Sequence, residues 1–368
     1  MNTSGNHSGV IKQMPDLHPV LKIPKDAMDK DLDLIGVPGG HINLRTGQLC
    51  PPDRSIYITK QLAVAPDGTC DTDRFDAFLK QVIPDKEVRE WLWHWFGYLL
   101  TGEVSAQIFT VFVGTGRNGK GVLTELLSWM LGGYAGALNT QVLMMKDNVN
   151  KSPELAGLRG FRFISAEEAS GTRTWDDALI KLMTGESHVT ARKLYQNEIS
   201  YMPQFKLTVN TNELPRIRNT GPAMRERMKV VRFPVYISED QRDPNLGKRL
   251  RTEAPGILYK MAQYASKVLM DGMPAVPEAM AKENRDYFED NDTILQWYND
   301  RIREQDGATL RSTAAYLDYK SWLTDGLYLH PATAFGQRFA SLAHKYPSKR
   351  VRQGKEYGGI RIKKGAIL

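Results

Sequence analysis

A glycine-rich loop occupies a place in the chain where its residue types and spacing could bind phosphate. Residues 108–113 before it are an unbroken apolar run, typical of a buried strand, and residues 122–131 after it have helical spacing. Strand, glycine loop and helix are the setting of a Walker A loop, whose backbone N–H groups converge on phosphate oxygens. A plain turn between core elements is the structural alternative. We predict that ATP binds to Gly114, Thr115, Gly116, Arg117, Asn118, Gly119, Lys120, Gly121 and Val122.

Lys120 is the expected catalytic cation of this loop, because its ammonium group would reach the β- and γ-phosphates as a point charge. The next position commonly holds a Ser or Thr hydroxyl that binds Mg²⁺, but in this chain it is Gly121. We predict that water or Thr124, one helical turn later, takes this place at the metal.

Polar side chains end two further predicted strands. Glu167 and Glu168 follow residues 161–165, and adjacent carboxylates there could orient Mg²⁺ and polarise an attacking water. We assign Glu167 to the metal and leave open which of the two is catalytic. Asn212 follows the strand at residues 204–209, and its uncharged amide could hold the γ-phosphate or the water. Solvated turns are the alternative for both places.

Arg225 and Arg227 precede a third strand, at residues 229–233. Arginines in this position could face outward and complete the nucleotide site of a neighbouring subunit. An arginine supplied in trans neutralises the charge that develops on the transferring phosphoryl group.

The elements that would carry these residues alternate between apolar strands and helical stretches from about residue 108 to 234, which is typical of an α/β sheet. Residues 34–47 predict a β-hairpin, and residues 73–100 predict two helices with aromatic stripes that suit a core. Helical segments follow around residues 244–270 and 277–303. The last part predicts helix, turn, helix and two short strands, an order that suggests a winged-helix module.

Composition and charge restrict the class of protein. The 368 residues carry 49 Lys and Arg against 42 Asp and Glu, so the net charge is +7, and residues 345–364 alone hold eight basic residues and one acidic residue. Lys349, Arg350 and Arg352 within this stretch are candidates for DNA contact, with a solvated basic end as the alternative. Apolar runs are too short for a membrane span. Two cysteines are too few for a disulfide scaffold and fit a reducing cytoplasm.

In their order and compact spacing these motifs resemble superfamily 3 helicases, AAA+ ATPases of small viruses, phages and plasmids. The similarity is greatest to the helicase part of poxvirus-type and satellite-phage primase–helicases. It is strong from about residue 33 to 235. Seven stretches carry it: residues 35–40, 44–47, 97–102, 116–121, 181–186, 190–195 and 207–215.

The resemblance implies an α/β fold with an AAA+ P-loop ATPase core, an N-terminal helical collar and a C-terminal winged-helix module. The expected divisions are a hairpin-containing segment (1–72), the collar (73–104), the superfamily 3 core (105–235), a helical segment completing collar and core (236–290) and a basic winged-helix-like module (291–368).

It also implies roles for single residues. Lys120 would be the Walker A lysine, Glu167 and Glu168 the Walker B pair, and Asn212 the sensor. Either Arg225 or Arg227 would be the arginine finger, and we favour Arg227. Residues 190–202 would form the hairpin that enters the channel of a hexameric ring, where Arg192 and Lys193 hold one DNA strand. An ordinary solvated loop is the alternative for this pair.

We therefore expect an ATP- and Mg²⁺-dependent hexameric DNA helicase that acts on single-stranded and forked DNA. It would serve the replication of a phage, satellite or mobile element in a bacterial cytoplasm, with 3′→5′ movement by analogy. About 100 residues precede the motor, too few for a primase domain, so a primase or polymerase would lie in an adjacent chain or in a longer parent chain. An ATP-switched origin-binding initiator without processive unwinding is the main alternative. A packaging or recombination motor and a small-molecule kinase are further ones.

Overall fold

The computed structural model describes residues 27–145, 152–167, 174–185, 187–192, 197–218, 220–324, 327–352 and 354–363. The predictions made for Glu168 and Lys193 therefore fall outside the described residues. Within these ranges, no helix is long and apolar enough to cross a membrane.

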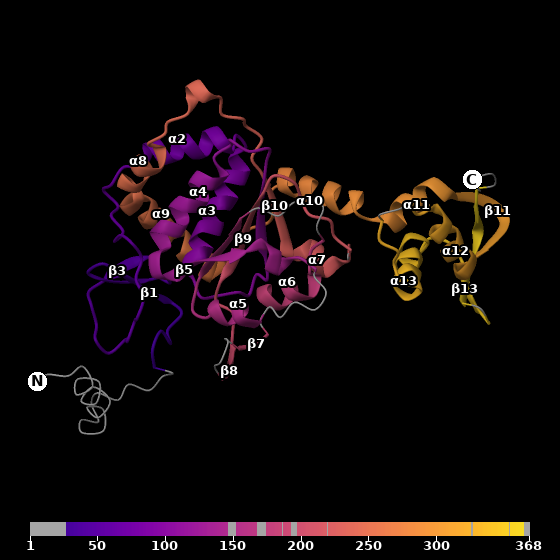
Figure 1. Cartoon of the computed structure of the whole chain (residues 1–368), viewed down its shortest axis with the longest axis horizontal. Helices are drawn as coiled ribbons and strands as arrows, with labels where there is room; N and C mark the ends of the chain where they lie inside the picture. The colour runs from indigo at the N-terminus through magenta and orange to yellow at the C-terminus, as the bar shows by residue number, and fades with distance from the viewer. Residues whose placement is uncertain are drawn as a thin grey trace, which may run out of the picture.

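A five-stranded parallel sheet forms the centre of the structure (Figure 1). Its order is β10-β4-β9-β6-β5, so the strand that leads into the glycine loop, β4, lies between β10 and β9. Because every neighbouring pair is parallel, the carboxyl ends of all five strands meet at one edge, where ligands of such sheets bind. The predicted α/β class is confirmed. The strands are β4 Phe109–Val113, β5 Ala135–Asn139, β6 Phe163–Glu167, β9 Lys206–Thr211 and β10 Met228–Arg232.

Alternate side chains of the strands enter two separate apolar cores, one on each face of the sheet. Phe112 and Val231 enter the first core, and Val111 and Val230 enter the second. The first core is closed by α2 Asp73–Val82, α3 Lys86–Leu100, α4 Lys120–Leu131, α8 Leu246–Thr252 and α9 Ala254–Asp271. The second is closed by α5 Ser152–Gly157, α6 Asp177–Thr184, α7 Pro222–Arg227 and α10 Glu278–Asp290.

The N-terminal part of the described chain packs on the first core. The predicted hairpin is confirmed as β1 Leu34–Val37 and β2 Gly40–Asn43, and a third strand, β3 Gln48–Cys50, extends it. Both predicted helices of residues 73–100 are present as α2 and α3, with their aromatic side chains buried. Asp85 begins α3 because its carboxylate accepts hydrogen bonds from the N–H groups of Glu87 and Val88.

Two buried cations join α3 to the amino-terminal ends of the central strands. The Arg162 guanidinium donates to the carbonyl oxygens of Leu100 and Leu34, and the Lys206 ammonium donates to the carbonyl of Thr101. Lys206 also donates to the carbonyls of Glu103 and Gln204 at 3.3 Å. Burial lowers the pKa of both groups, that of Arg162 to about 10. The carbonyls at the end of α3, which no helical N–H can reach, are thus satisfied by side chains of the sheet.

Lys206→Met is expected to lower the free energy of unfolding by about 3 kcal/mol, because it leaves several buried carbonyls without a donor. Chemical denaturation measures this change. Lys282→Met, which removes an exposed ammonium on α10, is the matched control and should leave the midpoint unchanged. Equal stability of the two variants would contradict a structural role for the buried ammonium.

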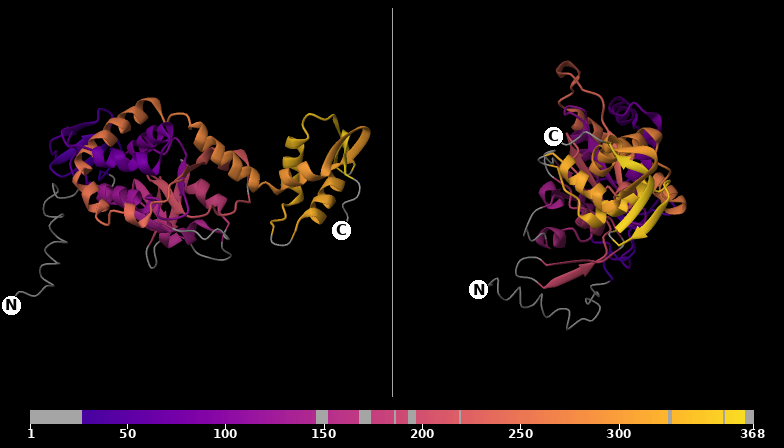
Figure 2. Two further views of the ribbon diagram at one scale, coloured as in Figure 1. Left: turned by 90° about the horizontal axis from the view of Figure 1, so that it is seen from above. Right: turned by 90° about the vertical axis from the view of Figure 1, so that its right-hand side faces the viewer.

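The C-terminal elements follow α10, which lies along β10 and leads away from the sheet (Figure 2). They surround a third core around Trp297. Their antiparallel sheet has the order β11-β13-β12. The predicted helix-turn-helix and two strands are present, preceded by one more helix and strand. The elements are α11 Thr293–Arg301, β11 Ile302–Arg311, α12 Ser312–Trp322, α13 Ala332–Leu342, β12 Ser348–Val351 and β13 Gly354–Ile362.

Two boundaries differ from the sequence prediction, and one strand is additional. Residues 244–270 form two helices that meet at Glu253, since Pro255 in the first turn of α9 cannot continue α8. Residues 277–303 are also divided, because Asp292 begins α11 by accepting a hydrogen bond from the N–H of Leu295. β11 was not expected at all: its side chains are mostly polar and exposed, so the chain shows no alternating apolar pattern there.

Candidate nucleotide and nucleic-acid sites

The glycine loop connects the buried strand β4 to α4, as predicted. Gly119 has a φ of 84°, a left-handed conformation that favours glycine, and a Cβ atom there would lie 2.6 Å from the Val82 side chain of α2. A Cβ on Gly114 would lie 2.3 Å from the Asn118 amide nitrogen and 2.6 Å from the Phe233 carbonyl. The loop can therefore fold back on itself only because glycine stands at both places.

Lys120 lies in the centre of the loop with its side chain turned inward. Its ammonium nitrogen is 2.6 Å from the Gly114 carbonyl oxygen, 3.2 Å from Asn118 Oδ1 and 3.5 Å from Asn212 Oδ1. The residue is 6% exposed, and burial lowers the pKa of the ammonium group. Within the described ranges of the chain, this cation has only neutral oxygens as hydrogen-bond partners and no carboxylate beside it. A phosphate would supply the missing charge.

Asn118 provides a second sign that the loop fits a phosphate. Its buried amide nitrogen has no hydrogen-bond partner among the described residues. A buried donor without a partner is costly, so a ligand with acceptor oxygens would stabilise it. Together with the free N–H groups at the start of α4, these donors suit the phosphates of ATP.

The predicted acid and amide lie on the same edge of the sheet as Lys120. Glu167 is the last residue of β6 and is exposed, and Asn212 directly follows β9. β9 lies between β4 and β6, and Glu167 is paired in register with Asn210. The edge therefore presents the lysine, the amide and the carboxylate in this order. Such an exposed carboxylate next to a phosphate loop can take part in Mg²⁺ binding.

Thr124, the proposed substitute at the metal, lies one turn into α4. Its hydroxyl is buried and accepts a hydrogen bond of 2.9 Å from the Asn210 amide nitrogen. Asn210 thus positions the helix against β9, a role that the sequence did not reveal. The metal role of Thr124 stays a prediction, and water is the other candidate.

The two candidate finger residues have different surroundings on α7. Arg225 donates from Nε to the Thr220 carbonyl at 2.7 Å, lies 5.0 Å from the ring of Phe288 and is 4.0 Å from the Asp292 carboxylate. Burial lowers its pKa. Arg227 donates to Gln107 Oε1 at 2.6 Å and to the Ala223 carbonyl at 2.9 Å, while its buried Nε has no hydrogen-bond partner among the residues described.

The segment that was predicted to be a hairpin contains a two-stranded ribbon, β7 Val189–Arg192 and β8 Glu198–Tyr201, and its place in a channel stays a prediction (Figure 1). Its base is anchored, since Val189 and Ala191 are buried and the Tyr201 hydroxyl donates to the Leu155 carbonyl of α5 at 2.5 Å. Arg192 is exposed at the end of β7. The ribbon therefore holds a basic side chain away from the core.

The predicted basic residues of the C-terminal part lie on β12 and in the turn after it. Lys349 pairs with Glu356 at 3.1 Å, whereas Arg350 stands directly opposite another cation, Lys355, on β13. Like charges in cross-strand positions repel. Arg352 follows in the turn and is exposed.

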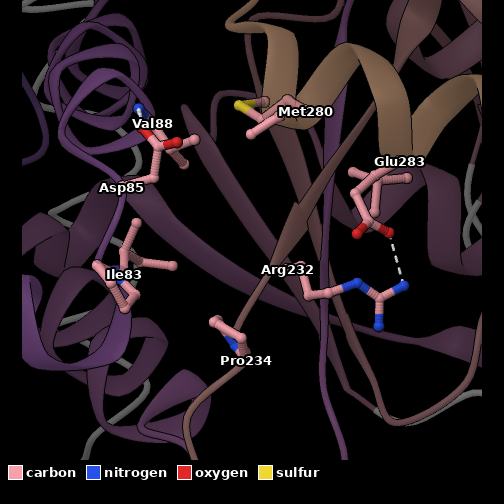
Figure 3. A pocket seen from close by; sticks show the side chains of 10 residues that line it. Ile83, Asp85, Val88, Arg232, Pro234, Met280 and Glu283 are labelled. Atoms are coloured by element: carbon pink, nitrogen blue, oxygen red, sulfur yellow. Dashed lines mark hydrogen bonds and ion pairs between the residues drawn. The ribbon is translucent and has the colours of Figure 1, made fainter.

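A pocket of about 260 Å³ lies between the α2–α3 connection, β10 and α10 (Figure 3). Ile83, which follows the α2 residues that pack on Gly119, lines it together with Pro234 and Met280. Its charged side chains already have partners, because Arg232 and Glu283 form an ion pair of 2.6 Å and Asp85 caps α3. The pocket is thus an apolar space between α3, β10 and α10.

Comparisons with known proteins give the same assignment as the sequence motifs. Residues 2–84 match the family described as "D5 N terminal like", and residues 112–227 match a family of unknown function, DUF5906. The protein named "Putative helicase L207/L206" of Acanthamoeba polyphaga mimivirus is 31% identical over 239 residues, covering 63% of this chain and 25% of that protein. The protein named "Putative helicase 022R" of Frog virus 3 is 28% identical over 269 residues, which cover 67% of this chain and 27% of that protein. The chain is thus similar to viral proteins named as helicases.

Other relatives agree with this, and the predicted resemblance is confirmed. The protein named "Putative primase C962R" of African swine fever virus is 25% identical over 170 residues, which cover 45% of this chain and 18% of that protein. The chain spans only about a quarter of the length of the curated proteins that it matches first.

The fold also has a counterpart among solved structures. The apo structure of the NrS-1 C-terminal region superimposes with a TM-score of 0.52 at 12% identity, covering 97% of this chain and 90% of that chain. The likeness concerns the fold alone.

Proposed function

We propose that this protein is an ATP-hydrolysing motor that forms rings and moves DNA during replication of a phage, satellite or mobile element. The observation that carries the proposal is the meeting of Lys120, Asn212 and Glu167 at one edge of a parallel sheet. Lys120 Nζ lies 3.5 Å from Asn212 Oδ1, and Glu167 ends the strand beyond. The names of its relatives support helicase and replication roles for such a site.

The residues fit hydrolysis of a bound triphosphate. Lys120 would balance charge on the β- and γ-phosphates, Asn212 would hold the γ-phosphate or the water, and the Walker B pair would polarise that water. Mg²⁺, held by Glu167 and by water or Thr124, would neutralise phosphate charge.

An arginine from the next subunit would complete the site, and we favour Arg227 for this role. Arg225 is already used within its own chain, against Thr220, Phe288 and Asp292. Arg227 also donates within its own chain, to Gln107 and to the Ala223 carbonyl, but its Nε–H lacks an acceptor in the described structure. Binding at the boundary between subunits would make hydrolysis depend on assembly, with α2 and α3 as the collar of a hexamer.

The β7–β8 ribbon would hold one DNA strand in the channel of the ring. Lys and Arg contacts to the phosphate backbone carry no sequence information, which suits a motor that must pass any sequence. The double variant Arg192→Ala with Lys193→Ala should keep basal ATP hydrolysis within about twofold and lose unwinding by about tenfold or more, since several phosphate contacts per ring are lost. Arg285→Ala, an exposed arginine on α10, is the control. Unwinding at the parental rate would remove the ribbon from the mechanism.

The C-terminal elements would form a winged-helix-like module that contacts DNA. Their order, three helices with a three-stranded antiparallel sheet, supports this. A phosphate group would relieve the repulsion between Arg350 and Lys355, and the exposed Arg352 could bind the same DNA backbone.

The proposal is tested by measuring ATP hydrolysis and particle mass together, with and without single-stranded DNA. We expect hydrolysis that single-stranded DNA stimulates, and a mass near six chains with a non-hydrolysable ATP analogue. A monomer without turnover under every condition would refute the proposal. Sequence-specific duplex binding with negligible turnover would favour the origin-binding initiator instead.

A further inference from the structure

The order of the strands restricts where the base of a bound nucleotide can lie. This inference rests on the proposed function, since it assumes that a nucleoside triphosphate binds to the glycine loop. Glu167 and Asn212, which would face the γ-phosphate, belong to β6 and β9, on one side of β4. A triphosphate that crosses Lys120 from that side must leave the loop on the other side. There the neighbouring strand is β10, and the chain that follows β10 is the next structure to meet the ribose and base.

That chain, residues 233–242, is fastened across the glycine loop. The Ile237 N–H donates to the carbonyl of Arg117 at 2.8 Å, and the Arg117 guanidinium donates to the Tyr236 hydroxyl at 3.2 Å. Arg242 donates to the Ile237 carbonyl at 3.1 Å and lies 3.4 Å from the same hydroxyl. Arg117 itself has a φ of 52°, an uncommon left-handed conformation for a residue with a side chain.

Tyr236 is the exposed aromatic side chain of this segment, since Phe233 is buried; it is 56% exposed although two guanidinium groups bind its hydroxyl. An exposed but oriented ring beside a phosphate loop gives a flat face for stacking. Ile237, the next residue, and Val122, at the start of α4, are only partly buried against the first core, so both have exposed apolar surface. A Cβ on Gly121 would meet no atom within 4 Å, so the approach from the phosphates is open.

The 260 Å³ pocket on the same side is a poorer place for the base. Its charged groups are paired with each other or with the backbone of α3, and it opens between α10 and the α2–α3 connection rather than at the loop.

We propose that Tyr236 is the stacking platform for the nucleobase of the bound triphosphate, held in place by Arg117 and Arg242. The expected ligand is a purine nucleoside triphosphate, since the larger ring covers more of the phenol face. The base is thus recognised through its flat surface, and the triphosphate through the loop.

The test compares two probes on the full chain with Mg²⁺: a non-hydrolysable ATP analogue, and inorganic tripolyphosphate, which lacks a base. Calorimetry should find that Tyr236→Ala lowers the affinity for the ATP analogue about tenfold or more, which is the usual effect of removing one aromatic stacking partner. Tripolyphosphate should bind as before. Tyr236→Phe, which keeps the ring, should retain nearly the parental affinity. Tyr259→Ala, at an exposed tyrosine on α9, is the matched control.

If Tyr236→Ala lowered the affinity for both probes equally, the proposal would be overturned, since Tyr236 would then act on the loop through Arg117. Unchanged affinity for the analogue would overturn it as well. If the parental chain binds neither probe, the nucleotide site itself is wrong, and the proposed function falls together with this inference.

Discussion

Lys120→Ala protein is expected to hydrolyse ATP about a hundredfold to a thousandfold more slowly than the parental chain, as is usual when a group that stabilises transition-state charge is removed. The reason is geometric: the ammonium group is the buried cation within the loop, 2.6 Å from the Gly114 carbonyl and 3.5 Å from Asn212 Oδ1. Phosphate release in the presence of single-stranded DNA measures the change.

Two controls make this result specific. Lys282→Ala removes an exposed ammonium on α10 and should leave hydrolysis unchanged. Thermal melting of Lys120→Ala should show a folded protein, since the first core around α4 is not altered. DNA-stimulated turnover that persists in a folded Lys120→Ala protein would show that the loop is not the hydrolytic site.

Arg227→Ala has the second largest expected effect, a loss of about a thousandfold in turnover, as for other arginine fingers. Arg225→Ala should instead lower the melting temperature, because it breaks contacts to Thr220 and Phe288. The two arginines are thus separable: one variant loses turnover at parental stability, and the other loses stability.

Mixing experiments test whether Arg227 acts in trans. Neither Arg227→Ala nor Lys120→Ala protein alone can form an intact junction, whereas random mixing at equal amounts leaves about a quarter of head-to-tail junctions intact. Turnover should therefore recover in mixed rings. Absence of recovery at every ratio would mean that each subunit completes its own site.

Local patterns were sufficient to predict the nucleotide loop and the strand ends. The apolar run before Gly114 and the helical spacing after Lys120 are consequences of neighbouring residues, so the sequence carries them directly. Sheet order was needed to bring Asn212 next to Lys120, and no local pattern contains that order.

Contacts between distant segments could not be predicted. Arg162 and Lys206 look like ordinary strand residues, yet they bind carbonyls about 60 to 130 residues away. Tyr236 follows β10 without any motif, and the hydrogen bonds that join Ile237 and Tyr236 to Arg117 reveal its position beside the loop. β11 escaped prediction for a different reason, because its polar residues pair with β13 without a buried face of their own.

Strand displacement on two forked duplexes, one with only a 3′ tail and one with only a 5′ tail, tests the central claim most directly. The account predicts displacement on the 3′-tailed fork with ATP, and none with the non-hydrolysable analogue. Displacement on the 5′-tailed fork alone would mean that the protein is a motor that moves in the opposite direction, 5′→3′. ATP consumption without displacement on either fork would contradict the claim that hydrolysis at this sheet edge drives movement along DNA.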